Sequence, residues 1–69
     1  MGLFGSSWVT VRTESGARAD DIDRLYANFK AEGLKAKVTM EGNSIKRIHV
    51  KKNDIDRAKE LMEAFDENS

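Results

Sequence analysis

The chain has 69 residues, of which 39% are hydrophobic and 35% are charged, and its 12 basic and 12 acidic side chains give a formal net charge of zero. This length allows one domain at most, with a marginal core that a partner subunit would help to complete. The absence of Cys excludes disulfides and thiolate metal sites. No apolar run approaches the roughly 18 residues of a membrane span, and no signal-peptide pattern is present, so we expect a cytoplasmic protein.

The first six residues, Met1–Ser6, fit the loose pattern for N-myristoylation. That pattern is short and matches by chance, so a flexible arm is the simpler interpretation. We therefore expect an arm over residues 1–6, one α+β domain over residues 7–66 and a frayed end over residues 67–69.

Residues 7–13 alternate in polarity and are rich in β-branched side chains, which predicts a strand with Val9 and Val11 facing the core. The side chains of opposite parity are Trp8, Thr10 and Arg12. The segment Glu14-Ser15-Gly16 is expected to end this strand.

Two segments have the helical period. The first, Asp20–Glu32, is expected to begin at an Asp20 N-cap and to end at a left-handed Gly33. The second follows an Asn53 cap and runs to about Asp66. Their apolar stripes consist of Ile22, Leu25, Tyr26 and Phe29 in the first and of Ile55, Ala58, Leu61, Met62 and Phe65 in the second.

Between the helices, Leu34–Glu41 and Ser44–Lys52 alternate around the turn signal Gly42-Asn43, which predicts a β-hairpin. The side chains expected to face the core are Leu34, Ala36, Val38, Met40, Ile48 and Val50. The side chains expected to face away are Lys35, Lys37, Thr39, Glu41, Arg47, His49 and Lys51. Ile45 is out of phase, which indicates either a bulge near the turn or a partly covered outer face.

The expected element order is β-α-β-β-α. A right-handed crossover places the first strand beside the third, in the order 1-3-2, with both helices on one face. This is an α+β fold with a three-stranded antiparallel or mixed sheet, a ferredoxin-like arrangement that lacks its last strand. The first strand would then be an exposed edge at which two copies of the chain could pair into a homodimer.

Basic side chains gather in the predicted strands, which hold seven of the twelve Lys and Arg residues and one carboxylate, Glu41. These seven are Arg12, Lys35, Lys37, Lys46, Arg47, Lys51 and Lys52. If both helices cover one face, the other face is basic. The candidate binding surface on that face consists of Trp8, Thr10, Arg12, Lys35, Lys37, Arg47, His49 and Lys51.

This surface has three interpretations. Basic groups with Trp8 and His49 could bind nucleic acid or another polyanion. Trp8 could instead anchor a dimer interface, or the face could be an ordinary solvated sheet. The sequence pI near 6.6 lacks the basic excess typical of nucleic-acid-binding domains, which favours a protein-interaction surface.

No residue set indicates a reaction. His49 is the only histidine, and no Cys accompanies it, so no metal cluster or catalytic pair is expected around it. The Asp residues at 20–23 and 54–56 lack calcium-loop spacing and are explained by the preference for acidic side chains in a first helical turn. We therefore expect no catalytic residues, no cofactor and no metal site.

Three segments carry a resemblance: Ala31-Glu32-Gly33-Leu34, Ile48-His49-Val50 and Asp56-Arg57-Ala58-Lys59-Glu60-Leu61. Over about residues 7–65 the chain resembles small domains classed as prokaryotic signal-transducing proteins. These have a helix with a closing glutamate–glycine step, then a hairpin and a last helix after an inward-facing valine. The resemblance implies a bacterial regulatory or interaction module without catalytic residues. The chain lacks the Cys-rich metal ribbon of some of these domains, which puts any role that depends on the ribbon in doubt.

The leading functional hypothesis is therefore a small non-enzymatic interaction or regulatory module that associates with itself through the edge strand or the open sheet face. The alternative is a module that binds nucleic acid or another polyanion through the basic face.

Overall fold

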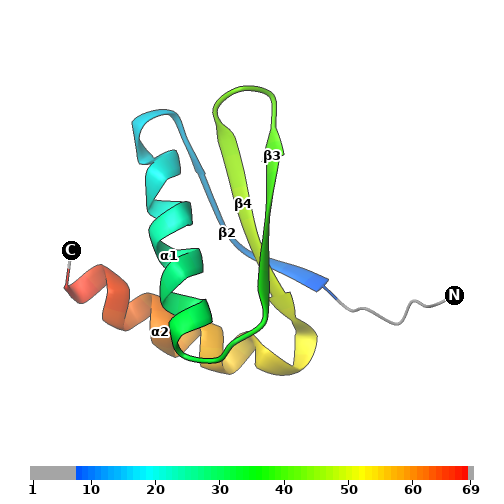
Figure 1. The fold of residues 1–69 in the computed structure, drawn as a ribbon, viewed down its shortest axis with the longest axis vertical. Helices are drawn as coiled ribbons and strands as arrows, with labels where there is room; N and C mark the ends of the chain where they lie inside the picture. The colour runs from blue at the N-terminus through cyan, green and yellow to red at the C-terminus, as the bar shows by residue number, and fades with distance from the viewer. Residues whose placement is uncertain (1–7, 69) are drawn as a thin grey trace, which may run out of the picture.

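The computed structural model describes residues 8–68, and the predicted arm of residues 1–6 lies outside this range. The elements in chain order are β2 (Trp8–Ser15), α1 (Ala19–Ala31), β3 (Ala36–Glu41), β4 (Ile45–Lys51) and α2 (Ile55–Glu67), with 3-10 turns at Gly16–Arg18 and Lys52–Asp54 (Figure 1). The predicted β-α-β-β-α order and α+β class are confirmed.

The three strands form one sheet in the order β2-β4-β3, as predicted, and both pairings are antiparallel. The helices pack on the face of the sheet that carries Ile48 and Val50 (Figure 1). The opposite face carries no helix of residues 8–68, and we call it the helix-free face.

The core lies between α1, α2 and the central strand β4. Its largest fully buried side chains are Phe29, Ile22, Leu25, Ile48 and Val50. Each contributes about 1.5–3 kcal/mol by leaving water. None of the helices within residues 8–68 is long and apolar enough to cross a membrane.

The helix starts differ from the prediction. The residues before α1 and α2 are Arg18 and Asp54, and neither caps the helix with its side chain, so the predicted Asp20 and Asn53 caps are wrong. A 3-10 turn precedes each helix, and its first carbonyl accepts the N–H of Ala19 or Ile55 instead. A side-chain cap is therefore not needed at that position.

The end of α1 follows the prediction at Gly33, whose φ of 79° is in the left-handed region. The Gly33 N–H donates to the Lys30 carbonyl at 3.0 Å, and the Leu34 N–H donates to the Phe29 carbonyl at 2.8 Å. These two bonds form a Schellman motif, which a residue with a Cβ would strain. The motif turns the chain into β3.

A β-bulge in β2 reverses the predicted parity of its second half. Thr10 pairs with His49, but Arg12, rather than Val11, pairs with the buried Ile48. Because opposed residues share a face, Arg12 lies on the helix side of the sheet. The prediction that Arg12 belongs to the helix-free face is therefore wrong, because strict alternation was assumed through a bulged strand.

Arg12 connects β2 to the end of α2. Its side chain is 18% exposed, and it donates to Asp66 at 2.9 Å and to Glu14 at 3.0 Å. Burial by itself lowers the pKa of Arg12, but the hydrogen bonds to Asp66 and Glu14 outweigh burial, so that the pKa is raised. Because of the bulge, Arg12 joins β2 to α2 instead of contributing positive charge to the helix-free face.

The hairpin end of the sheet extends past the helices. Met40 has the parity of the core side chains, as predicted, but it is 59% exposed. Ile45 pairs with Ser15 and Glu41 on the helix-free face and is half-buried, which fits the partly covered outer face rather than a bulge near the turn. This end therefore offers apolar surface on both faces.

Replacing Arg12 with Ala is expected to lower the free energy of unfolding by about 1–2 kcal/mol, because Glu14 and Asp66 lose a charge-assisted partner. The matched control is Arg18→Ala: Arg18 is 69% exposed and lies 3.6 Å from Glu14, so its loss should cost less than about 0.5 kcal/mol. Urea unfolding measures both. Equal effects of the two substitutions would contradict the structural role of Arg12.

Candidate functional site

The helix-free face is built by alternate residues of the three strands. By register it carries Trp8, Thr10, Thr13, Ser15, Lys37, Thr39, Glu41, Ile45, Arg47, His49 and Lys51. Six predicted members of the candidate surface lie on this face: Trp8, Thr10, Lys37, Arg47, His49 and Lys51. The pairing of strands far apart in sequence brings them together.

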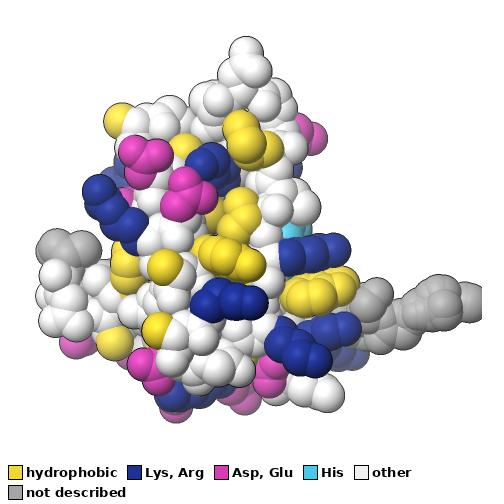
Figure 2. Space-filling model, in the orientation of Figure 1, with side chains coloured by type: hydrophobic (Ala, Val, Ile, Leu, Met, Phe, Trp, Pro, Cys, Tyr) yellow, Lys and Arg dark blue, Asp and Glu magenta, His cyan; other side chains and the backbone are white. Residues whose placement is uncertain are grey.

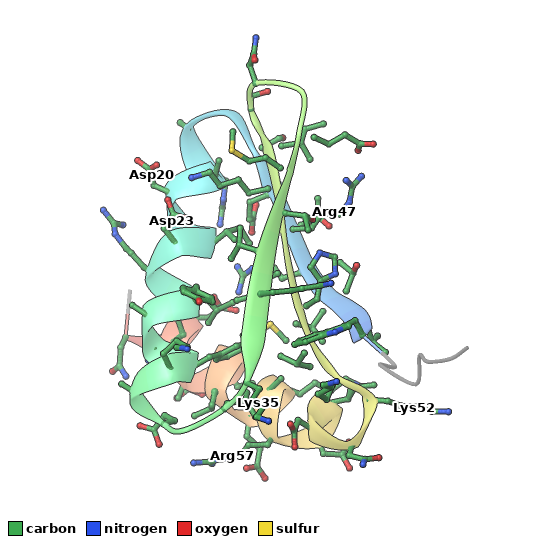
Figure 3. The ribbon with its side chains drawn as sticks, turned by 45° about the vertical axis from the view of Figure 1, so that its right-hand side comes forward. Asp20, Asp23, Lys35, Arg47, Lys52 and Arg57 are labelled. Atoms are coloured by element: carbon green, nitrogen blue, oxygen red, sulfur yellow. The ribbon has the colours of Figure 1, made fainter. Side chains whose placement is uncertain are left out.

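The remaining predicted members lie elsewhere. Lys35 is exposed in the loop before β3, at the end of the sheet near α2 (Figure 3). Arg12 is on the helix side, as described above. Lys46, also a strand cation, points to α1 and contacts Asp23 at 2.6 Å. The helix-free face is therefore less basic than the composition of the strands suggested.

Two lysine side chains on this face contact the ring of Trp8. The Lys51 Nζ lies 4.7 Å from the centroid of the Trp8 ring, and the Lys37 Nζ lies 4.9 Å from it. Lys51 stands directly opposite Trp8 in the register, whereas Lys37 reaches the ring from β3. Each contact is worth about 0.5–1 kcal/mol at an exposed site. We call Trp8, Lys37 and Lys51 the Trp8 cluster. Figure 2 shows basic side chains beside hydrophobic atoms near the single histidine.

The two ammonium groups of the Trp8 cluster are available to an anion. No carboxylate of residues 8–68 forms an ion pair with Lys37 or Lys51. Arg47 differs, since its guanidinium lies 2.6 Å from the Glu41 carboxylate. Figure 3 shows Arg47 on the side of the sheet away from α1. Uncompensated positive charge on this face thus lies at the Trp8 end.

The side chain of His49, on the central strand β4, lies within hydrogen-bond distance of a threonine on each neighbouring strand. Its Nδ1 lies 2.9 Å from Thr10 Oγ1 on β2, and its Nε2 lies 2.8 Å from Thr39 Oγ1 on β3. Burial, then the charges of Lys37 and Arg47, lower the pKa of His49, so the ring is neutral near pH 7. In the neutral ring one nitrogen donates and the other accepts from a hydroxyl. Both nitrogens are engaged, which makes His49 a structural cross-link rather than a free base.

The sequence did not reveal these roles. Thr39 was expected on this face, but its bond to His49 depends on a register that alternation alone does not fix. Thr13 reaches the face because of the bulge, which left no signal in the residue pattern. The arrangement can bind an anion through two oriented ammonium groups, with the Trp8 ring as an apolar floor.

Comparison of the chain with profiles of known protein families, with curated proteins and with solved structures finds no match. The resemblance to signal-transducing domains therefore stays a prediction.

The lowered pKa of His49 predicts a dependence of stability on pH. The unfolded chain binds the proton at the ordinary pKa of about 6.5, so the folded state loses stability as pH falls through that value. His49→Gln removes the titration and keeps an amide that can bond to the threonines. Unfolding midpoints in urea at about pH 7.5 and 5.5 should differ less for this variant than for the natural chain. An equal pH dependence in both chains would contradict the prediction.

Proposed function

We propose that this chain is a small, non-enzymatic interaction module that binds an acidic segment of a partner protein at the Trp8 cluster. The observation that carries this proposal is the pair of ammonium groups, Lys37 and Lys51, held 4.9 and 4.7 Å from the Trp8 centroid without a carboxylate partner in residues 8–68. An acidic side chain that enters there gains two charge-assisted contacts and apolar cover from the indole.

The geometry favours a carboxylate ligand over a nucleic-acid base. Stacking on Trp8 would require a base to compete with two cations that already contact the ring. Arg47 is neutralised by Glu41, and His49 is uncharged, so the face offers few positive groups for a phosphate backbone. Nucleic acid or another polyanion is kept as the second candidate, because the same two lysines would attract phosphate.

Association of two copies through their helix-free faces is disfavoured by charge. That arrangement would bring the Lys37 and Lys51 ammonium groups of one copy toward those of the other, and like charges in contact oppose binding. A partner with acidic side chains has the complementary charge. The resemblance to prokaryotic signal-transducing domains supports a regulatory role in a bacterial cytoplasm, and we include that role in the proposal.

A fluorescence titration tests the proposal, because Trp8 is the only Trp in the chain. A Glu-rich peptide is expected to change the emission of Trp8 in a saturable manner, and added salt should weaken the binding. Lys51→Gln should weaken it by roughly fivefold, as loss of one charge contact worth about 1 kcal/mol. The matched control, Lys59→Gln, changes an exposed residue of α2 and should leave affinity unchanged.

The same titration with single-stranded oligouridylate separates the two candidates. Binding of the peptide but not the oligonucleotide at moderate salt supports the acidic-segment proposal. Binding of the oligonucleotide alone would replace it with the polyanion alternative, and a response that is identical in the Lys51→Gln variant would exclude the Trp8 cluster as the site.

A further inference from the structure

The outer edge of β3 is the more regular of the two sheet edges in residues 8–68. Among the strands that the structure describes, β3 pairs only with β4, over Ala36–Glu41, without a register shift. β2 is interrupted by the bulge between Thr10 and Arg12, a common way to protect an edge from pairing. The sequence predicted association through the first strand or the open sheet face, and the structure adds a third candidate, the straight edge of β3, which is suited to strand addition.

We propose that a second copy of this chain pairs with β3 in antiparallel orientation, with the two-fold axis at Thr39. The pairing surface is the outer edge of β3, which shares only Lys37 with the Trp8 cluster, so the inference goes beyond the proposed function. In this register Thr39 faces the second copy's Thr39, and Lys37 faces the second copy's Glu41. The axis is perpendicular to the sheet, and the two sheets join into one with all helices on the same side.

Charge complementarity selects this arrangement. Lys37 and Glu41 lie two residues on either side of Thr39 on the same face, so the two-fold axis generates two opposite-charge pairs, in each of which Glu41 also keeps Arg47 of its own chain as a neighbour. A parallel in-register pairing would instead place Lys37 beside Lys37 and Glu41 beside Glu41, which is unfavourable. Of the two in-register pairings, the antiparallel one is therefore the one in which the charges of the strand are complementary.

The apolar side chains of β3 support the same register. On the helix side, Val38 faces the second copy's Met40, and Met40 faces the second copy's Val38. Met40 is 59% exposed in the single chain, and it is the one large hydrophobic side chain within residues 8–68 that is exposed. Pairing at β3 would cover it. Within residues 8–68 neither helix covers the hairpin end of β3, so a second copy has room to approach there (Figure 1).

The charge pairs can be tested by exchanging the signs of the charges. Lys37→Glu alone places two glutamates opposite each other, one from each copy, and Glu41→Lys alone opposes two lysines. Each variant should therefore associate at least tenfold more weakly than the natural chain. A mixture of the two variants should form a heterodimer, because each contributes the charge that the other has lost. The double variant with both substitutions in one chain should associate with itself again. Matched controls are Lys59→Glu and Glu63→Lys on exposed positions of α2.

Sedimentation equilibrium on the full chain is the measurement. One strand per copy buries less than a standard interface of about 1,600 Å², so we expect a dissociation constant on the order of 100 μM. A monomer at about 1 mM overturns the proposal. A dimer that Glu41→Lys does not weaken, or a mixture that fails to associate, overturns the β3 register. Met40→Gln provides a second variant at an exposed position, and it should weaken the dimer without loss of folded signal in circular dichroism.

The outcome can be separated from that of the proposed function. Lys51→Gln is expected to weaken peptide binding and to leave the dimer unchanged, because Lys51 is on β4. Met40→Gln is expected to weaken the dimer and to leave peptide binding unchanged, because Met40 lies on the helix side of the sheet and carries no charge. Either proposal can therefore fail while the other stands.

Discussion

The packing of the central strand β4 against α1 and α2 is the constraint on which the other features depend. Ile48 and Val50 are fully buried between the sheet and the helices, and β4 is the only strand with a neighbour on each side in the described sheet. Because side chains alternate, burial of these two residues forces His49 and Lys51 to the opposite face. The registers with β2 and β3 then decide which residues stand beside them. The arrangement of side chains on the candidate binding surface is thus a consequence of the core.

The sequence was sufficient for those parts of the fold that depend on local pattern. Helical stripes, the Gly33 end of α1 and the hairpin at Gly42 follow from residue type and spacing, and the crossover rule adds the strand order. The sequence was insufficient in β2, where tertiary contacts interrupt the regular alternation of side chains between the two faces of the sheet. At the bulge in β2, Val11 packs on the core as predicted, but Arg12 also lies on the helix side and bonds to Asp66, a contact that is not visible in the sequence. One unpaired residue was enough to move Arg12 to the other face.

The zero net charge conceals a division between the two sides of the sheet. On the helix side, strand cations are matched by helix carboxylates, as Lys46 is by Asp23 and Arg12 is by Asp66. On the helix-free face the one acidic side chain of the described strands is Glu41, and it is engaged by Arg47. The excess that remains is small, two lysines beside an indole. Counting the basic residues of the strands overestimated the positive charge of the helix-free face. The count included cations, such as Arg12 and Lys46, that pair with helix carboxylates on the other side of the sheet.

The two proposed surfaces meet at Lys37. Its ammonium lies near the Trp8 ring, and its position in β3 places it opposite Glu41 of a second copy in the antiparallel register. One ammonium cannot satisfy an acidic peptide and a second copy's carboxylate equally well. If both surfaces operate, occupation of one must weaken the other by the same factor in either direction, because linkage between binding equilibria is reciprocal. Self-association and partner binding would then compete with each other for Lys37.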